Sequence, residues 1–181
     1  VENNMRRGRI LAIIILQIAS LAVVALSFWL AVSAYLLLPD IVAVHFDLSG
    51  VPDHWETKTW FAVLDLPLIQ LGVFLLVTGL NIWTVLSPKS LAYINLPIDM
   101  RELSSAEQKE KIRLLAAFSG SLINLFTMIF MTYVNYFVLQ SEKTSRGGPE
   151  GQVFFATGAF LACLSGIVAW VIKEARRIAQ S

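Results

Sequence analysis

The sequence predicts an all-α fold, an integral membrane bundle of four transmembrane helices with a folded extracytoplasmic loop between the first two. Three observations lead to this prediction. The 181 residues are 56% hydrophobic and 15% charged, and their mean hydropathy is +0.67, whereas soluble domains average about 45–50% apolar and about 25% charged residues. Apart from Asp65, the charged residues lie between long apolar runs or at their ends. A polar segment with histidines, acids and tryptophans separates the first two runs.

The apolar runs set the positions of the expected helices. Each run reaches the length of about 20 residues that an α-helix needs to cross the hydrocarbon core. Lipid offers the backbone no hydrogen-bond partner, so each run is expected to be helical. We therefore predict one membrane domain over residues 1–181. Its transmembrane segments are residues 10–38, 60–86, 113–140 and 153–173, joined by an outer loop at 39–59, a cytoplasmic loop at 87–112, a second outer loop at 141–152 and a cytoplasmic tail at 174–181.

A cleaved signal peptide is the alternative interpretation of the N-terminal run, because three arginines precede it. The apolar part of this run is about twice the usual length of about 7–15 residues. No small-residue cleavage site ends it. We therefore expect a first helix that stays in the protein.

Basic residues lie mainly on one side of the expected spans. The loops 39–59 and 141–152 hold few of them. The positive-inside rule therefore predicts cytoplasmic termini and an outward-facing loop 39–59. We expect the protein to lie in the inner (plasma) membrane. The net charge of +1 gives no indication of a nucleic-acid partner. The basic residues on the predicted cytoplasmic side are Arg6, Arg7, Arg9, Lys89, Arg101, Lys109, Lys111, Arg113, Lys173, Arg176 and Arg177.

The outer loop reads LPDIVAVHFDLSGVPDHWETKTW from Leu38 to Trp60. Apolar residues recur at every second position over 41–47, which predicts a short extended segment with one apolar face. The stretches LSG and VPD then predict turns. Trp55 and Trp60 are typical of the aromatic belt at a membrane surface. We therefore expect the loop to fold back onto the outer face of the membrane.

Side chains of the kinds that bind transition metals occur in and near this loop. Their spacing matches no strong metal-binding or catalytic motif, and the expected spans hold no histidine for an axial haem ligand. We therefore predict no cofactor and no catalytic residue. The loop is then a structural cap or a binding surface, and the sequence leaves both interpretations open. The weak metal-ligand candidates are His45, Asp47, Asp53 and Asp65.

Polar residues in the spans predict contacts between helices. Asp65 lies about one turn from the outer end of the second span, so its carboxylate is expected to face the bundle and pair with the loop. Lys58 is expected to pair with Asp53 or Asp65. Asn124 and Asn135 are three helical turns apart on one face of the third span, and we expect both to hydrogen-bond neighbouring helices.

Two further patterns concern the third and fourth spans. Ser104 and Glu107 have the spacing of a capping box, which predicts that a helix begins there and continues into the third span. Gly158, Ala162 and Gly166 recur at four-residue steps, a spacing that lets helix backbones approach closely. Their packing partner is expected to be a neighbouring span or another chain.

The stretch LPDIVAVHFDLSGVPDHWETK resembles the DUF1648 segment, whose members carry a similar pattern of HF, G, PD, W and K after a first membrane helix. The later stretch YINLP resembles the asparagine–proline motif that follows the second span of such proteins. The sequence departs from the family at two points: no proline precedes the histidine, and IDMREL replaces the usual lysine and tryptophan after NLP. The resemblance singles out His45, Gly50, Asp53, Lys58, Asn95 and Pro97.

This resemblance implies an SdpI-like bacterial integral membrane protein, in a family that includes the immunity and signalling protein for a bacterial toxic peptide. We therefore expect a non-enzymatic binding, immunity or signalling factor that uses its outer loop. The main alternative is an accessory subunit packed against a larger membrane complex, because the chain is small and shows no chemistry of its own. A metal-dependent membrane enzyme or a transporter is the third alternative. The expected partners are the lipid bilayer and another membrane protein or a peptide.

Overall fold

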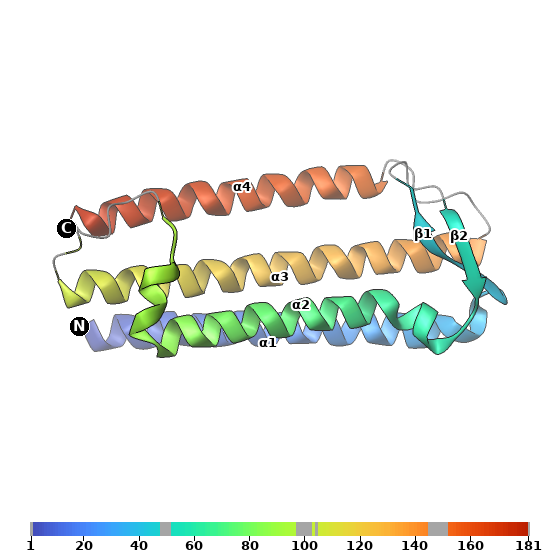
Figure 1. Ribbon diagram of the computed structural model, residues 1–181, viewed down its shortest axis with the longest axis horizontal. Helices are drawn as coiled ribbons and strands as arrows, with labels where there is room; N and C mark the ends of the chain where they lie inside the picture. The colour runs from blue at the N-terminus through green and yellow to red at the C-terminus, as the bar shows by residue number, and fades with distance from the viewer. Residues whose placement is uncertain (1, 48–51, 97–102, 104, 145–151, 181) are drawn as a thin grey trace. The chain divides into compact units, whose positions relative to one another are not determined.

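The structure, a computed structural model, describes residues 2–47, 52–96, 103, 105–144 and 152–180. Within these residues, four helices are long and apolar enough to cross a membrane, which confirms the predicted fold class. They are α1 (Glu2–Ala34), α2 (Trp60–Leu86), α3 (Ala106–Thr144) and α4 (Gln152–Ala179), with strands β1 (Ile41–Phe46) and β2 (Pro52–Thr57) between α1 and α2 (Figure 1). Short 3₁₀ helices follow α1 at Tyr35–Leu37 and α2 at Pro88–Tyr93.

Local sequence sets the end of α1 and the start of α2. The chain becomes extended at Leu38 (φ −79°, ψ 149°), because the ring of Pro39 would clash with a helical backbone at the preceding residue. Thr59 precedes α2, and its Oγ1 accepts a hydrogen bond of 3.1 Å from the backbone N–H of Ala62. This bond satisfies one of the amide groups that have no partner inside the first turn of a helix.

The outward faces of the long helices are apolar. Ile18 on α1, Leu76 on α2 and Phe155 on α4 are 62%, 65% and 82% exposed. Soluble monomers rarely expose apolar surface of this extent. Lipid tails, in contrast, surround such side chains without the free-energy cost that water imposes. The surface therefore agrees with helices that cross a bilayer.

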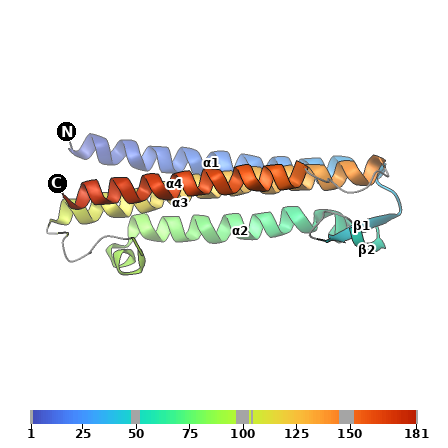
Figure 2. The same cartoon turned by 90° about the horizontal axis from the view of Figure 1, so that it is seen from above.

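The chain folds into two compact units, and every long helix contributes one segment to each of them. Unit 1 comprises Val1–Ala19, Leu75–Leu125 and Ala162–Ser181, and unit 2 comprises Ser20–Phe74 and Phe126–Leu161. The start of α1 and the end of α4 lie at the same end of unit 1 in both views (Figures 1 and 2). The strands β1 and β2 belong to unit 2.

A cluster of hydrogen-bonded polar side chains joins α1, α2 and α3 inside unit 1. Gln17 on α1 accepts hydrogen bonds at Oε1 from Thr78 Oγ1 on α2 (2.9 Å) and from Asn124 Nδ2 on α3 (3.0 Å). Gln17 Nε2 donates to Ser121 Oγ on α3 (3.0 Å). Asn124 is 1% exposed. Its predicted role in bonding between helices is therefore confirmed.

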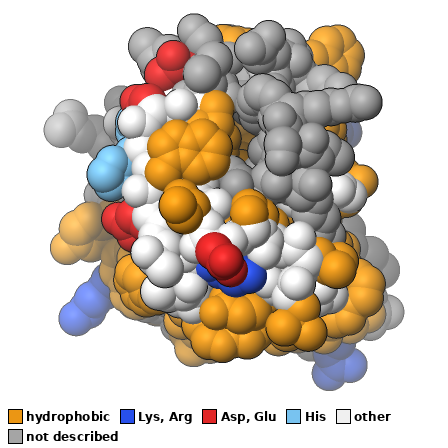
Figure 3. Space-filling view, turned by 90° about the vertical axis from the view of Figure 1, so that its right-hand side faces the viewer, with side chains coloured by type: hydrophobic (Ala, Val, Ile, Leu, Met, Phe, Trp, Pro, Cys, Tyr) orange, Lys and Arg blue, Asp and Glu red, His pale blue; other side chains and the backbone are white. Residues whose placement is uncertain are grey.

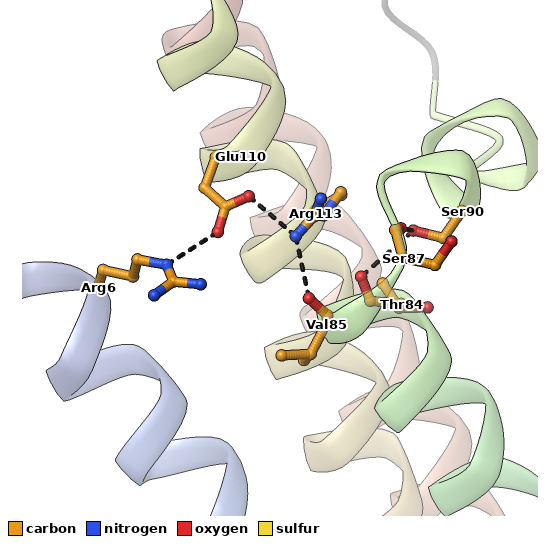
Figure 4. Close-up of polar contacts among 7 residues, drawn as sticks. All are labelled: Arg6, Thr84, Val85, Ser87, Ser90, Glu110 and Arg113. Atoms are coloured by element: carbon orange, nitrogen blue, oxygen red, sulfur yellow. Dashed lines mark hydrogen bonds and ion pairs between the residues drawn. The ribbon is translucent and has the colours of Figure 1, made fainter.

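Two arginine side chains, Arg6 and Arg113, join α1, α2 and α3 at one end of unit 1 (Figure 4). Arg113 Nη2 on α3 donates to the carbonyl oxygen of Val85 at 2.9 Å and lies 2.9 Å from Glu110 Oε2. Glu110 Oε1 accepts a hydrogen bond of 3.1 Å from Arg6 Nε on α1. Val85 lies in the last turn of α2, where carbonyl groups have no partner inside the helix. Arg113 therefore caps α2 and is itself held in place by Glu110.

The capping box of α3 lies one residue later than predicted. Ser105 Oγ accepts a hydrogen bond from the backbone N–H of Gln108 (3.0 Å), and Gln108 Oε1 accepts one from the backbone N–H of Ser105 (3.1 Å). The predicted pairing of Ser104 with Glu107 stays a prediction. Glu107 pairs with Lys111, and Ser104 lies outside the described residues. The sequence SSAEQ has the required spacing in both registers, so spacing alone does not choose between them.

Buried amides also join the helices inside unit 2. Gln70 Nε2 on α2 donates to the carbonyl oxygen of Met128 (3.0 Å) and to Thr132 Oγ1 (2.9 Å) on α3. Asn135 Nδ2 on α3 donates to the carbonyl oxygen and to Oγ of Ser27 on α1, at 3.1 and 3.0 Å. The predicted contact of Asn135 with a neighbouring helix is therefore confirmed.

The small-residue face of α4 is open, although α4 makes aromatic contacts elsewhere. Gly158, Ala162 and Gly166 are all exposed. A Cβ atom placed on Gly158 or Gly166 would meet no described atom within 4 Å. In unit 2, Phe160 stacks on Phe130 of α3 with ring centroids 4.7 Å apart. Among the described residues, therefore, no neighbouring helix packs against these two glycines.

We predict that Gln17→Ala destabilises the protein by about 2 kcal/mol, because it removes three hydrogen bonds that are each worth roughly 0.6 kcal/mol in a membrane protein. Thermal unfolding in a mild detergent, followed by circular dichroism, measures the loss. Gln180→Ala is the matched control, because Gln180 is exposed. Equal stability of the two variants would contradict the structural importance of the polar cluster.

Candidate functional site

The strands β1 and β2 form an antiparallel hairpin next to the start of α2, as both views show (Figures 1 and 2). The predicted extended segment is therefore confirmed. The register shifts on either side of His45, and Val42 and Ala43 are both buried. Val44 and Phe46 are half-buried, whereas His45 and Asp47 are exposed, which agrees with the predicted apolar face. Buried Ala43 departs from that face, where a bulge interrupts the alternation of side chains. The register pairs Ile41 with Thr57, Val42 with Glu56, Ala43 with Trp55, His45 with His54 and Phe46 with Pro52.

Lys58 holds the base of the hairpin. Its backbone N–H donates to the carbonyl oxygen of Asp40 (2.8 Å), and its Nζ donates to the carbonyl oxygen of Leu38 (2.7 Å). The same Nζ lies 4.0 Å from Asp40 Oδ1. The predicted pairing of Lys58 with Asp53 or Asp65 is therefore wrong. Lys58 follows β2 directly, and the antiparallel ladder places this position beside the residues that precede β1.

His45 and Asp53 meet across the two strands. His45 Nδ1 lies 2.5 Å from Asp53 Oδ1, and the two side chains are 67% and 48% exposed. Figure 3 shows the face at this end, where acidic and histidine side chains lie beside hydrophobic ones. A pair in contact with solvent contributes little stability. The contact therefore fixes the direction of the two side chains more than it stabilises the hairpin.

The predicted metal-ligand candidates do not come together as one group. His45 and Asp53 are paired, whereas Asp47 follows β1 and Asp65 lies on α2. In the part of the chain that the structure describes, no group of three or more His, Cys, Asp or Glu side chains is arranged to hold a metal ion.

A cavity of about 490 Å³ lies between β1, α2 and α3 in unit 2. Its walls are mainly apolar and include Val42 of β1, Phe61 of α2 and Val134 of α3. The hairpin therefore covers a space between two helices, which is more than a connector between them would do. The polar residues of the lining are His45, Glu56, Asp65 and Asn135.

Asp65 is half-buried in the wall of this cavity. Its carboxylate forms no hydrogen bond and no ion pair with any residue that the structure describes. Among the described residues, the predicted pairing of Asp65 with the loop is therefore wrong. A carboxylate in an apolar surrounding costs free energy unless water or another group meets it. Asp65 therefore leaves the cavity with an acidic group available to a ligand.

Glu56 and Asn135 line the cavity, although the sequence patterns do not indicate them as site residues. Glu56 lies opposite Val42 in the hairpin register, so a correct register would have placed it near the apolar side of β1. Asn135 is predicted to bond a helix and does so through Nδ2. Its place in the lining depends on how α3 packs against the hairpin, which no local pattern encodes.

The residues of the family motif fall into different parts of the structure. His45 and Lys58 lie in unit 2, in the hairpin and at its base. Asn95 is exposed and lies in unit 1, after the second 3₁₀ helix. Gly50 and Pro97 lie outside the described residues. The hairpin part of the motif is therefore the part that adjoins the cavity.

The apolar helices define a multi-pass membrane protein with a small hairpin between its first two spans. Residues 22–71 match the family described as "Domain of unknown function (DUF1648)". The chain therefore contains a DUF1648 domain, and the resemblance seen in the loop is confirmed. The matched segment runs from α1 through the hairpin into α2 and lies wholly in unit 2. Comparisons with curated proteins and with solved structures give no match.

Proposed function

We propose that this protein is a non-enzymatic membrane protein that binds a ligand in the cavity beneath the β1–β2 hairpin and acts as a binding, immunity or signalling factor. The cavity carries this proposal. Its volume of about 490 Å³ falls in the range of about 300–1,000 Å³ typical of ligand pockets. Such pockets are mainly apolar, with a few polar groups that set the orientation of the ligand. The lining of this cavity is likewise mainly apolar and includes a few polar residues.

The position of the DUF1648 match supports the same site. The lining residues on β1, β2 and α2 all fall within residues 22–71, and only α3 supplies lining residues from outside the match. The family segment thus coincides with the hairpin and one wall of the cavity. A role in immunity or signalling comes from the resemblance to SdpI-like bacterial membrane proteins and forms part of this proposal.

We place the hairpin on the extracytoplasmic side of a bacterial inner (plasma) membrane, with both termini in the cytoplasm. The distribution of basic residues along the sequence supports this orientation, because the loops 39–59 and 141–152 hold only Lys58, Lys143 and Arg146. Cytoplasmic segments carry an excess of arginine and lysine. A ligand would then enter the cavity from outside the cell.

We predict that Ala62→Phe lowers ligand affinity at least tenfold, because Ala62 lines the cavity and the larger ring fills part of it. The measurement is calorimetric titration of the purified protein in phosphatidylcholine nanodiscs with 4-phenylbutanol, a small neutral probe. Ala25→Phe is the matched control, because Ala25 is exposed on α1. Equal binding by the wild type and Ala62→Phe would contradict the proposed function.

An accessory subunit is the second candidate, and the open face of α4 favours it. Gly158, Ala162 and Gly166 are exposed, and no described atom would touch a Cβ on either glycine. Small residues at four-residue steps allow a helix of another protein to approach closely. In this proposal, α4 packs against a helix of a larger membrane complex.

We predict that Gly158→Leu with Gly166→Leu releases the protein from such a complex without unfolding it, because the added side chains meet open space in the isolated chain. Light scattering after mild solubilisation of native membranes measures the mass. Ala22→Leu, on the exposed face of α1, is the control. A wild-type mass equal to that of one chain would count against this candidate.

A further inference from the structure

We infer that the cavity beneath the hairpin selects a cationic amphiphile, a small apolar body that carries one ammonium or guanidinium group placed at Asp65. This inference rests on the proposed function, because it concerns the same cavity and adds the chemical class of its ligand. It follows from the charges of the lining, from the lack of a partner for Asp65 among the described residues, and from the size of the space.

As far as the structure describes it, the lining of the cavity carries two carboxylates and no lysine or arginine. Its titratable residues are Asp65, Glu56 and His45. His45 is already in contact with Asp53. Glu56 Oε1 lies 3.6 Å from His54 Nε2, a contact between exposed side chains that leaves Glu56 57% exposed. The field inside the cavity therefore favours a positive ligand.

Lys58 is the cation nearest to Asp65 in the sequence, and its other contacts hold it away. Its Nζ donates to the carbonyl oxygen of Leu38 at 2.7 Å and lies 5.4 Å from the centre of the Tyr35 ring. Its side chain is 17% exposed. A lysine with these contacts would have to give them up to neutralise Asp65. Among the described residues, therefore, no base neutralises the acid.

The remaining lining residues suit the rest of such a ligand. Val42, Val134 and Leu139 supply apolar walls from β1 and α3. Asn135 is 2% exposed and adds a polar group to the same lining. An ammonium group has three N–H donors, and Glu56 and Asn135 add further acceptor oxygens to the same lining. The cavity thus provides apolar walls for the body of such a ligand and acidic groups for its cationic head.

The volume limits the size of the occupant. A space of about 490 Å³ holds a small organic molecule or one basic side chain with its neighbours, and it excludes a folded peptide or a protein. A free amine and a lysine side chain at the end of a larger ligand would both present an ammonium group to the cavity. Two pairs of probes, each with a charged and a neutral member, distinguish these sources.

The first pair is 4-phenylbutylammonium and 4-phenylbutanol, and the second is a capped Leu-Lys-Leu tripeptide and its Leu-norleucine-Leu counterpart. Each probe is titrated by calorimetry into the full chain in phosphatidylcholine nanodiscs. We expect the wild type to bind at least one cation at least tenfold more tightly than its neutral counterpart. We expect Asp65→Asn to lose this preference while it keeps its affinity for 4-phenylbutanol. Asp40→Asn, which changes the net charge equally at a residue outside the lining, keeps the preference.

The outcomes separate this inference from the proposed function. Equal affinity of the wild type for the charged and neutral probes overturns the inference and leaves the cavity as a binding site. A preference that survives in Asp65→Asn, or that disappears in Asp40→Asn, also overturns it. A preference shown by the tripeptide pair alone supports a lysine side chain as the source, and one shown by the small amine supports a free molecule. No binding of any probe overturns both the inference and the proposed function.

Discussion

Polar groups inside an apolar bundle must find partners within the protein, because lipid offers none. This constraint organises both units of the chain. In unit 1, Gln17 meets donors from α2 and α3 and itself donates to α3. In unit 2, Gln70 and Asn135 join α3 to α2 and to α1. These bonds specify which helix faces meet, because an apolar surface alone packs against lipid as well as against another helix.

The hairpin obeys the same constraint at the end of the helices. Lys58 bonds the carbonyl oxygen of Leu38, which lies where the chain leaves its helical conformation, and so fixes the base of the hairpin. β1 then covers the space between α2 and α3. Asp65 departs from the pattern, since no described residue meets its carboxylate. A group that the fold leaves without a partner inside a cavity is a reasonable point for a ligand to bind.

Local patterns predict much of this fold and less of the candidate site. The helices follow from apolar runs long enough to span a bilayer, and the roles of Asn124 and Asn135 follow from their shared face. The register of the capping box does not follow from a local pattern. Gln108 also bonds the carbonyl oxygen of Ile178, a contact made only in the folded chain. The partner of Lys58 and the bulge at His45 depend on the strand register, which residue types alone do not fix.

The central claim is that the cavity opens on the extracytoplasmic side and holds a cationic ligand. Thiol labelling tests it most directly, in a Cys163→Ser background that removes the exposed native thiol. We predict that Ala62→Cys reacts with a membrane-impermeant thiosulfonate in intact cells and that 4-phenylbutylammonium slows the reaction. Asn95→Cys should react only after the cells are opened. Reaction of Asn95→Cys in intact cells, or no protection of Ala62→Cys, would contradict the account.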